Sequence, residues 1–479
     1  MQFNSWIFLF VFLPIVLFVY FNLNKYVSTK IATCFLNISS LFFYAYASWA
    51  YAIYFIVCIV ANYMVAKVLI KSRKKIVLIF GLLFNLGTLG WLKYCNFLIS
   101  TLNSVFKTDY NLVELFVPLG ISFFTFQFIA LIYDCYKGTV TKLSFLEYIT
   151  FATFFSKIIQ GPIMCYQDFQ EQYNLQRPNC FNIDNFAKGF YALTVGFGKK
   201  ILIADVLAEF VNPGFASEYV TYNSTMSILL MLAYTLQIYF DFSAYTDMAR
   251  GIGFMFNIEL PRNFDSPYKA LSIDSFWKRW HMSLTGFFTK YLYFPLGGSR
   301  KGEMRTYVNI LIVFALSGLW HGANYTFIIW GLLHGIAKVV ERKWNLLSKA
   351  HVTLQWGYTF LFTNVAWLFF RSGTLSQALT ILKNILRCDF SGVDALCLSR
   401  LILPEVGVVL DMIGFSFLPR IFPLIFLVVA FLVVLQAKNT DEVIKDFKPT
   451  FGKVMFTIGI MSWCILSFGT KITFIYEMF

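Results

Sequence analysis

Two histidines lie in a part of the chain that carries no charged residue. Residues 306–337 contain no Asp, Glu, Lys or Arg, and within them LSGLWHGANYTFIIWGLLHG (316–335) holds His321 and His334. Ionisable groups inside a membrane are costly and usually mark a pathway or a reaction centre. A neutral imidazole in such surroundings suits general-base chemistry, the removal of a proton from an attacking group.

The position of His321 favours a site well inside the bilayer. It lies about fifteen residues into the apolar run, roughly 22 Å from the end near Thr306 at 1.5 Å per residue. On a continuous helix, Ser317, His321 and Asn324 share one face. Gly322 permits close approach of another backbone or of a substrate. The residue types alone support two interpretations of His321 equally well: a catalytic base, or a group that forms a hydrogen bond between helices.

His334 is expected to play a different part. On the same continuous helix it would lie about 20 Å beyond His321 and on another face. It is close to Lys338, Glu341 and Arg342, where the chain leaves the apolar run. We therefore expect a histidine at the membrane boundary that does not act with His321.

A charged segment before this run carries a third histidine. Asp247–Arg305 holds nine basic and five acidic residues among apolar pieces too short to span a membrane. Asp274 or Ser275 is expected to cap a helix that begins at Phe276. An interfacial anchor would explain the tryptophans of that helix, but not a histidine in the centre of the apolar face. The residues on this face are Trp277, Trp280, His281, Leu284 and Phe288.

The elements that position these histidines are predicted to be membrane helices. The 479 residues are 58% hydrophobic and 13% charged, whereas a soluble domain carries roughly 25% charged residues. We predict an all-α polytopic membrane protein with about eleven transmembrane helices and some re-entrant segments. The segment that breaks at Gly161-Pro162 is either a re-entrant hairpin or a span that ends in the site. Without a linker or repeat, residues 1–479 are interpreted as one integral membrane domain. The apolar runs are Trp6–Asn22, Ile31–Ala66 (long enough for two passes), Ile76–Leu92, Leu115–Tyr133, Ser227–Phe240, Tyr307–Ala337, Leu354–Phe370, Phe415–Leu435 and Val454–Thr470.

Charge and cysteine content exclude several other classes. The net charge of +14 reflects Lys and Arg in short loops, as the positive-inside rule expects, and does not indicate nucleic-acid binding. The basic cluster in Lys67–Lys75 predicts a cytoplasmic loop and, three spans earlier, a periplasmic N-terminus with a retained first span. Nine scattered cysteines without a CxxC pair argue against a disulfide framework or a zinc site, so no metal is expected.

Several long motifs of this chain are similar to those of a known family. The chain resembles the membrane-bound O-acyltransferase family, and most closely its bacterial branch of alginate and peptidoglycan O-acetylation proteins. The resemblance is strong from about Pro118 to Gly335, so the motif-bearing core is about 118–335. The motifs are PLGISFFTFQ (118–127), IIQGPI (158–163), GFGKKILIADVLA (196–208), QIYFDFSAYTDMARGIG (237–253), FWKRWHMSLTGFFTKYLYFPLGGSRKG (276–302) and GLWHGANYTFIIWGLLHG (318–335).

The resemblance implies roles for particular residues. His321 matches the catalytic histidine of the family, and His281 matches a second histidine found in the bacterial branch. The family fold is a helical bundle around a tunnel through the membrane, with the acyl donor entering from the cytoplasm. Where the branch usually has an Arg-Asp pair, this chain has Thr289-Lys290, which puts any role of that pair in doubt. The residues expected to line the tunnel are Ser317, Asn324, Trp277, Trp280 and Asp241.

The function implied is acetyl transfer across the bacterial inner membrane. Acetyl-coenzyme A would be the donor substrate, with no bound cofactor, and an envelope or secreted polysaccharide the acceptor, with a periplasmic partner protein. Because the donor is polyanionic, Lys278, Arg279 and Arg300 are candidates for binding it. Two alternatives stay open: a D-alanyl transferase acting on teichoic acid, and a transporter. The transporter is disfavoured because no inverted repeat is evident. Asp241, placed at the end of a span, either orients a group near the tunnel or has a structural role, which we favour slightly.

Overall fold

The computed structural model of the chain describes residues 1–176, 181–344, 349–414, 418–468 and 474–475. These residues form helices and contain no β-strand, so the all-α prediction is confirmed. By the contacts between residues, the chain divides into two compact units, residues 1–193 with 248–262 and residues 194–247 with 263–479. The single integral membrane domain stays a prediction.

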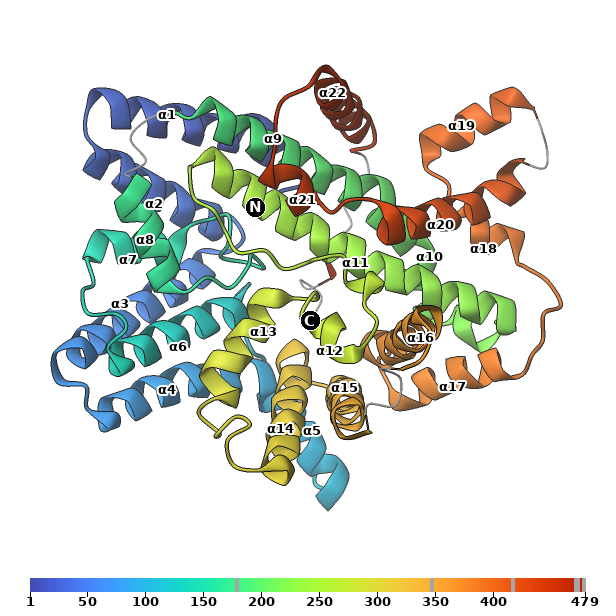
Figure 1. Cartoon of the computed structure of the whole chain (residues 1–479), viewed down its shortest axis with the longest axis horizontal. Helices are drawn as coiled ribbons and strands as arrows, with labels where there is room; N and C mark the ends of the chain where they lie inside the picture. The colour runs from blue at the N-terminus through green and yellow to red at the C-terminus, as the bar shows by residue number, and fades with distance from the viewer. Residues whose placement is uncertain (177–180, 345–348, 415–417, 469–473, 476–479) are drawn as a thin grey trace. The chain divides into compact units, whose positions relative to one another are not determined.

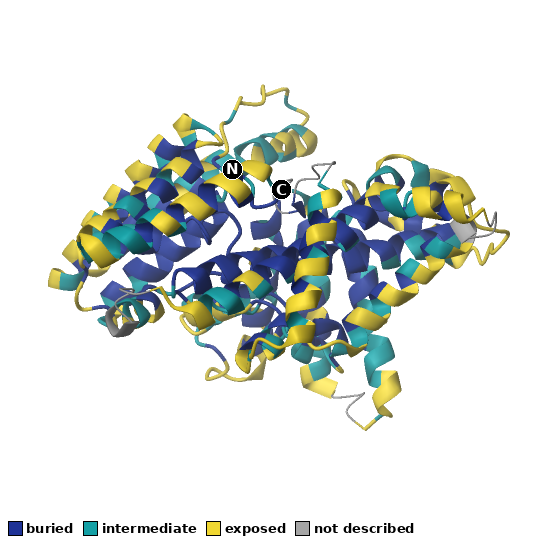
Figure 2. Cartoon of the chain, turned by 90° about the horizontal axis from the view of Figure 1, so that it is seen from above, coloured by how far each residue is buried: buried dark blue, intermediate teal, exposed yellow. Residues whose placement is uncertain are grey.

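The first unit consists of apolar helices whose outer faces expose large hydrophobic side chains. Its elements are η1 (Phe8–Phe12), α1 (Leu13–Tyr26), α2 (Thr29–Ala45), α3 (Trp49–Ser72), α4 (Lys75–Leu89), η2 (Gly90–Tyr94), α5 (Cys95–Phe106), α6 (Ile121–Lys137), α7 (Phe145–Thr153), α8 (Tyr166–Gln176) and most of α9 (Ile183–Phe197). On α3, for example, Ile53 and Met64 are exposed, whereas Phe55 is buried. Figure 2 shows buried and exposed residues following opposite faces of the helices. Apolar outer faces of this extent suit contact with lipid.

Two buried amide side chains inside this unit satisfy each other. Asn62 of α3 and Asn85 of α4 are both buried, and their side-chain amides exchange hydrogen bonds of 2.7 and 3.2 Å. Such paired amides hold apolar helices together where no water competes.

The Gly-Pro break lies in an irregular segment of the first unit. Between α7 and α8, residues 154–164 are buried without forming a helix. A Cβ at Gly161 would lie 2.3 Å from the Cα of Lys157, so this turn has no room for a side chain. Irregular backbone at membrane depth must be buried in protein. This segment meets that condition. It contains Gly161-Pro162, as predicted, but the helix ends earlier, at Thr153, and a re-entrant course of the chain stays a prediction.

The second unit contains all four histidines. Its long helix α11 (Ser224–Met255) is mostly buried and continues into the first unit at Met248. The hairpin of α14 (Glu303–His321) and α15 (Tyr325–Trp344) packs against α12 (Ile273–Trp277) and α16 (Val352–Arg371) (Figure 1). The other elements are η3 (Gly198–Ala204), α10 (Asp205–Ala216), η4 (Glu218–Val220), η5 (Pro267–Lys269), α13 (Met282–Phe288), η6 (Thr289–Tyr293), α17 (Leu375–Leu386), α18 (Ala395–Ser399), α19 (Pro404–Ile413), α20 (Leu418–Gln436), α21 (Thr440–Lys445) and α22 (Phe451–Leu466).

Most predicted apolar runs correspond to helices, with two corrections. The run Leu115–Tyr133 begins too early, because α6 starts only after Gly120, whose φ is 75°. The run Tyr307–Ala337 is not one helix but two. Four helices of the described residues are long and apolar enough to cross a membrane, so the count of about eleven spans stays a prediction. The runs Phe415–Leu435 and Val454–Thr470 lie partly outside the described residues.

Candidate active site

His321 is the last residue of α14, and the chain turns back immediately after it. Gly322 is extended, with φ −164° and ψ 151°, and α15 begins at Tyr325. Asn324 caps α15, because its Oδ1 accepts a hydrogen bond from the backbone N–H of Thr326 at 3.1 Å. The predicted stripe of Ser317, His321 and Asn324 on one helix face is therefore wrong for Asn324, whose Nδ2 donates to the carbonyl of Gly373 at 2.8 Å.

The two helices touch backbone to backbone through glycines. A Cβ at Gly318 of α14 would lie 2.2 Å from the carbonyl oxygen of Phe327. On the opposite helix, a Cβ at Gly331 would lie 2.2 Å from the carbonyl oxygen of Phe314. Only glycine permits this approach. The hairpin consequently brings the end of α14 close to the first two turns of α15.

His281 lies in a break between α12 and α13. α12 is capped by Ser272, whose hydroxyl accepts from the backbone N–H of Ser275 at 3.0 Å, so the helix predicted to start at Phe276 begins earlier and is short. The backbone of His281 is left-handed, with φ 45° and ψ 52°. Asn263 holds the turn, since its carbonyl oxygen accepts from the N–H of Met282 at 3.0 Å. A left-handed conformation is costly for a residue other than glycine and often accompanies function.

The fold brings the rings of His281 and His321 close together, at an interplanar angle of 54°. Their ring centroids are 6.4 Å apart, and the exposed fractions of the two residues are 0% and 3%. Trp320 contacts both rings, at 6.1 Å from His281 and 4.8 Å from His321. Phe242 of α11 packs edge-on against His281 at 4.7 Å. The two predicted catalytic histidines are thus neighbours in one water-excluded cluster.

His334 belongs to the same neighbourhood, contrary to the prediction that it lies about 20 Å from His321, whereas its place at a membrane boundary stays a prediction. It is fully buried, and its Nδ1 accepts a hydrogen bond from Nε1 of Trp277 at 3.2 Å. The Trp330 ring lies 5.1 Å from that of His321 and 5.2 Å from that of His334. Two rings that share this neighbour cannot be separated by the 20 Å of a straight helix. The hairpin at Gly322 is the physical reason.

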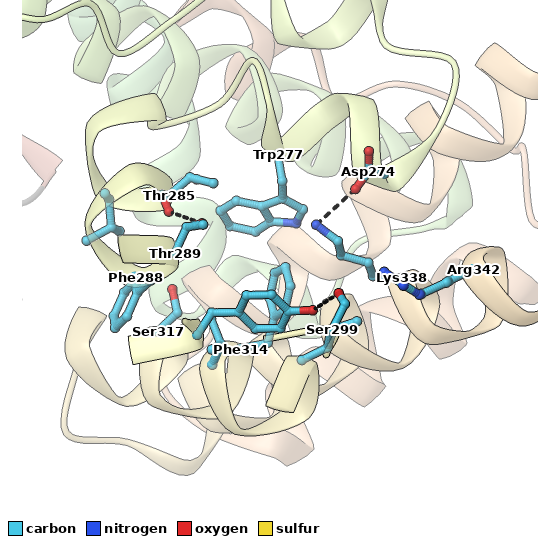
Figure 3. Close-up of a pocket in the computed structure, with 14 residues that line it drawn as sticks. Asp274, Trp277, Thr285, Phe288, Thr289, Ser299, Phe314, Ser317, Lys338 and Arg342 are labelled. Atoms are coloured by element: carbon cyan, nitrogen blue, oxygen red, sulfur yellow. Dashed lines mark hydrogen bonds and ion pairs between the residues drawn. The ribbon is translucent and has the colours of Figure 1, made fainter. Parts of the chain in front are cut away.

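A cavity of about 260 Å³ opens beside this cluster. Figure 3 shows Asp274, Lys338 and Arg342 at one side of it. This side is called the opening here, because these three residues are partly or fully exposed, whereas Trp277, Phe314 and Ser317 of the lining are buried. Ser317 is one helical turn before His321 on α14. The complete lining is Asp274, Trp277, Leu284, Thr285, Phe288, Thr289, Tyr293, Ser299, Ile310, Val313, Phe314, Ser317, Lys338 and Arg342.

The opening of the cavity carries paired charges and an excess of cations. Asp274 forms ion pairs with Lys278 at 2.6 Å and with Lys338 at 3.0 Å. Burial opposes ionisation of Asp274, but these two lysines hold its pKa below the usual range. Arg342 lines the same opening. An apolar interior with a cationic opening suits an acyl group attached to a polyanionic carrier.

The other predicted site residues lie elsewhere in the second unit. Trp280 is buried against Phe276 and Trp367 and does not line the cavity. Arg279 donates to the carbonyl of Asp265 at 3.1 Å. Arg300 is exposed and follows Ser299 of the cavity lining. In the Thr289-Lys290 pair, Thr289 lines the cavity.

Asp241 takes part in a buried ion network. It lies within α11, not at a helix end, because that helix continues to Met255. Lys200 Nζ is 2.6 Å from Asp241 and 2.9 Å from Asp205. The backbone N–H of Ile475 donates to the second oxygen of Asp241 at 2.8 Å. These contacts are consistent with a structural role for Asp241, the alternative that the sequence slightly favoured.

Sequence reasoning missed Trp330, Lys338 and Arg342 as parts of this neighbourhood. The signal available was the Gly-Ala-Asn turn after His321 together with the glycines at 318 and 331. Spaced glycines on two apolar helices indicate a close helix pair.

Comparison with known proteins defines the class. Residues 9–381 match the membrane-bound O-acyltransferase family, and the chain belongs to this family. It is therefore a multi-pass membrane protein and an O-acyltransferase. His281, His321 and the cavity all lie within the matched residues.

The particular relatives are bacterial proteins named for O-acetylation or D-alanylation. The chain is 39% identical over 433 residues to the peptidoglycan O-acetyltransferase of Helicobacter pylori, covering 83% of this chain and 82% of that protein. It is 36% identical over 391 residues to the probable alginate O-acetylase AlgI of Pseudomonas aeruginosa, covering 79% and 73%. A teichoic acid D-alanyltransferase of Bacillus subtilis is 28% identical over 250 residues, covering 50% and 63%.

Proposed function

We propose that this chain transfers acetyl groups from cytoplasmic acetyl-coenzyme A to hydroxyl groups of an envelope or secreted glycan across the bacterial inner membrane. The observation that carries the proposal is the contact of His281 with His321 beside a cavity with a cationic opening. The names of the relatives in Helicobacter pylori and Pseudomonas aeruginosa support a glycan acceptor. A periplasmic N-terminus and a periplasmic partner protein complete the proposal.

In this scheme His321 acts as the general base. It removes the proton from the attacking hydroxyl while the hydroxyl oxygen bonds to the acetyl carbonyl carbon. The carbon–sulfur bond then breaks, and the proton passes from His321 to the leaving thiolate. A positioned base contributes on the order of 10²–10⁴-fold to such a rate. His281, whose ring lies close to that of His321, orients it and does not itself carry the proton.

The cavity serves the donor. Lys338 and Arg342 line its opening, and cations at an opening raise the local concentration of a polyanionic substrate. The acyl thioester would extend inward along Phe314 and Ser317 toward His321, one helical turn further on α14. Lys278, beside Asp274, adds to the positive charge of the opening.

Acetyl transfer by purified protein tests this function. Detergent-purified protein is given acetyl-coenzyme A and a short N-acetylglucosamine oligosaccharide, and thiol release and ester formation are measured. His321→Ala should lower the rate at least about 10²-fold, the lower end for loss of a general base. His351→Ala is the matched control, because His351 is exposed and only caps α16. A wild-type rate in His321→Ala would refute the base, and wild-type protein that releases no thiol would refute the donor.

The D-alanyl alternative is addressed by the same preparation. It rests on the shorter and less identical match to the teichoic acid enzyme. A D-alanyl thioester of a carrier protein replaces acetyl-coenzyme A in the assay, and transfer from it alone would favour the alternative. The glycan itself is identified by comparing O-acetyl groups of all envelope glycans in a deletion strain and its parent.

A further inference from the structure

Two buried N–H groups beside His321 lack an acceptor in the part of the chain that the structure describes. They are Nε1 of Trp330 and Nε2 of His334, and both residues are fully buried. Buried polar groups in folded proteins are almost always hydrogen bonded, so each exception calls for an explanation. A buried donor without an acceptor lowers the stability of the folded protein. We therefore expect such a donor to form its hydrogen bond with a bound group during function.

The state of His334 follows from its one observed hydrogen bond. Nε1–H of Trp277 donates to Nδ1 of His334 at 3.2 Å, so Nδ1 is an acceptor and carries no hydrogen. In a neutral imidazole the hydrogen then resides on Nε2. His334 is therefore held as a donor through Nε2, the atom without an acceptor.

The rings that carry the two donors are close together and packed among other aromatic rings. Trp330 and His334 are one turn apart on α15, with ring centroids 5.2 Å apart. Trp367 stacks on Trp330 at 5.6 Å with an interplanar angle of 18°, and Phe362 packs edge-on against His334 at 5.2 Å. Packing of this kind fixes the direction of an N–H before any substrate arrives, which is the requirement for stabilising a developing charge.

The pair also adjoins both the proposed base and the cavity. The Trp330 ring lies 5.1 Å from that of His321. Trp277, which lines the cavity, contacts Trp330 at 5.7 Å and His334 at 5.1 Å. Ring contacts therefore connect the two donors both to the proposed base and to Trp277 in the wall of the cavity.

We propose that Nε1–H of Trp330 and Nε2–H of His334 stabilise the oxyanion that forms on the acyl carbonyl during transfer. This inference rests on the proposed function. When the hydroxyl oxygen bonds to the carbonyl carbon, the C=O electron pair moves onto the oxygen, which accepts both hydrogen bonds. The pair returns as the carbon–sulfur bond breaks, so the donors gain and lose no proton. Trp277 is then a positioning residue, because it sets the tautomer of His334.

Substitutions that remove only the N–H groups test the pair. Trp330→Phe and His334→Phe keep an aromatic ring, and each should lower kcat by about 10²–10³-fold, the loss found for a single oxyanion donor. KM for acetyl-coenzyme A should stay within about twofold, because the hydrogen bonds strengthen only in the transition state. His334→Gln, which retains an N–H, should keep more activity than His334→Phe.

Trp356→Phe is the matched control. Trp356 lies on α16, its Nε1 already donates to the carbonyl oxygen of Tyr268 at 2.9 Å, and its ring stacks on Phe360 at 5.2 Å. Its kcat should stay within a few-fold of wild type, and thermal unfolding in detergent shows that all variants are folded. Equal losses in Trp356→Phe and Trp330→Phe would show that Trp330 contributes only packing. Near wild-type kcat in folded Trp330→Phe and His334→Phe would overturn the proposal.

The experiments can refute the role of the two N–H groups and the acetyl-transfer function independently of each other. If the wild-type protein transfers D-alanyl groups and not acetyl groups, the acetyl assignment is refuted. The same variants measured with the D-alanyl donor still decide the role of the two N–H groups, because the reacting carbonyl is the same.

Discussion

Gly318→Ala should separate the two helices that position His321. The added Cβ would lie 2.2 Å from the carbonyl oxygen of Phe327, whereas ordinary van der Waals contact begins at 3.4 Å. The obstacle is backbone, which cannot rotate away as a side chain can. The end of α14 and the start of α15 must therefore move apart by more than 1 Å, a shortfall set by these same distances.

This displacement would move His321 and Trp330, the two residues to which the proposed chemistry is assigned. His321 follows Gly318 by about one turn on α14, and Trp330 follows Phe327 by about one turn on α15. A misplacement of about 1 Å in an active site can cost about 10²-fold in rate. Overpacking a close helix contact also costs typically about 1–3 kcal/mol of stability. We therefore expect at least about a tenfold loss of kcat in Gly318→Ala, together with a lower unfolding temperature.

Acetyl transfer and thermal unfolding of purified protein measure both effects. Gly357→Ala in α16 is the matched control, since its Cβ would meet nothing within 4 Å. It should leave the rate unchanged and slightly raise stability, because alanine favours the helix. Wild-type kcat in Gly318→Ala would show that the close contact of α14 and α15 does not position His321, and the reasoning above would be wrong.

Two further predictions concern His281 and the topology. His281→Asn should keep part of the activity and His281→Ala should lose it at equal protein levels, because asparagine tolerates the left-handed backbone seen at this position and can still hydrogen bond. If the two variants were equally inactive while folded, His281 would need a proton-transfer role. In a cysteine-free background, Ser72→Cys should react with a membrane-impermeant thiol reagent only from the cytoplasmic side, because Ser72 lies among the basic residues of Lys67–Lys75. Labelling from the periplasmic side would reverse the proposed direction of transfer.

The helical class and the importance of two histidines follow from local sequence. A charge-poor run such as Tyr307–Ala337 has to avoid water, and a histidine within it is costly enough to indicate function. The irregular backbone at Gly161-Pro162 was also predictable, because proline removes a backbone donor and glycine permits the turn. Each of these inferences depends only on residues that are neighbours along the chain.

The composition of the site was decided by tertiary contacts. Hydropathy does not distinguish one long helix from a hairpin, so His334 was predicted far from His321 and at the boundary. The turn at Gly322 brings both against Trp330, and the left-handed His281 turns its ring toward His321. Sequence by itself determined that these histidines must be buried in a membrane helical protein. Only the packing of α12, α14 and α15 decided which of them meet, because the distance between side chains on different helices is set by close backbone contacts such as that at Gly318 and not by their separation along the chain.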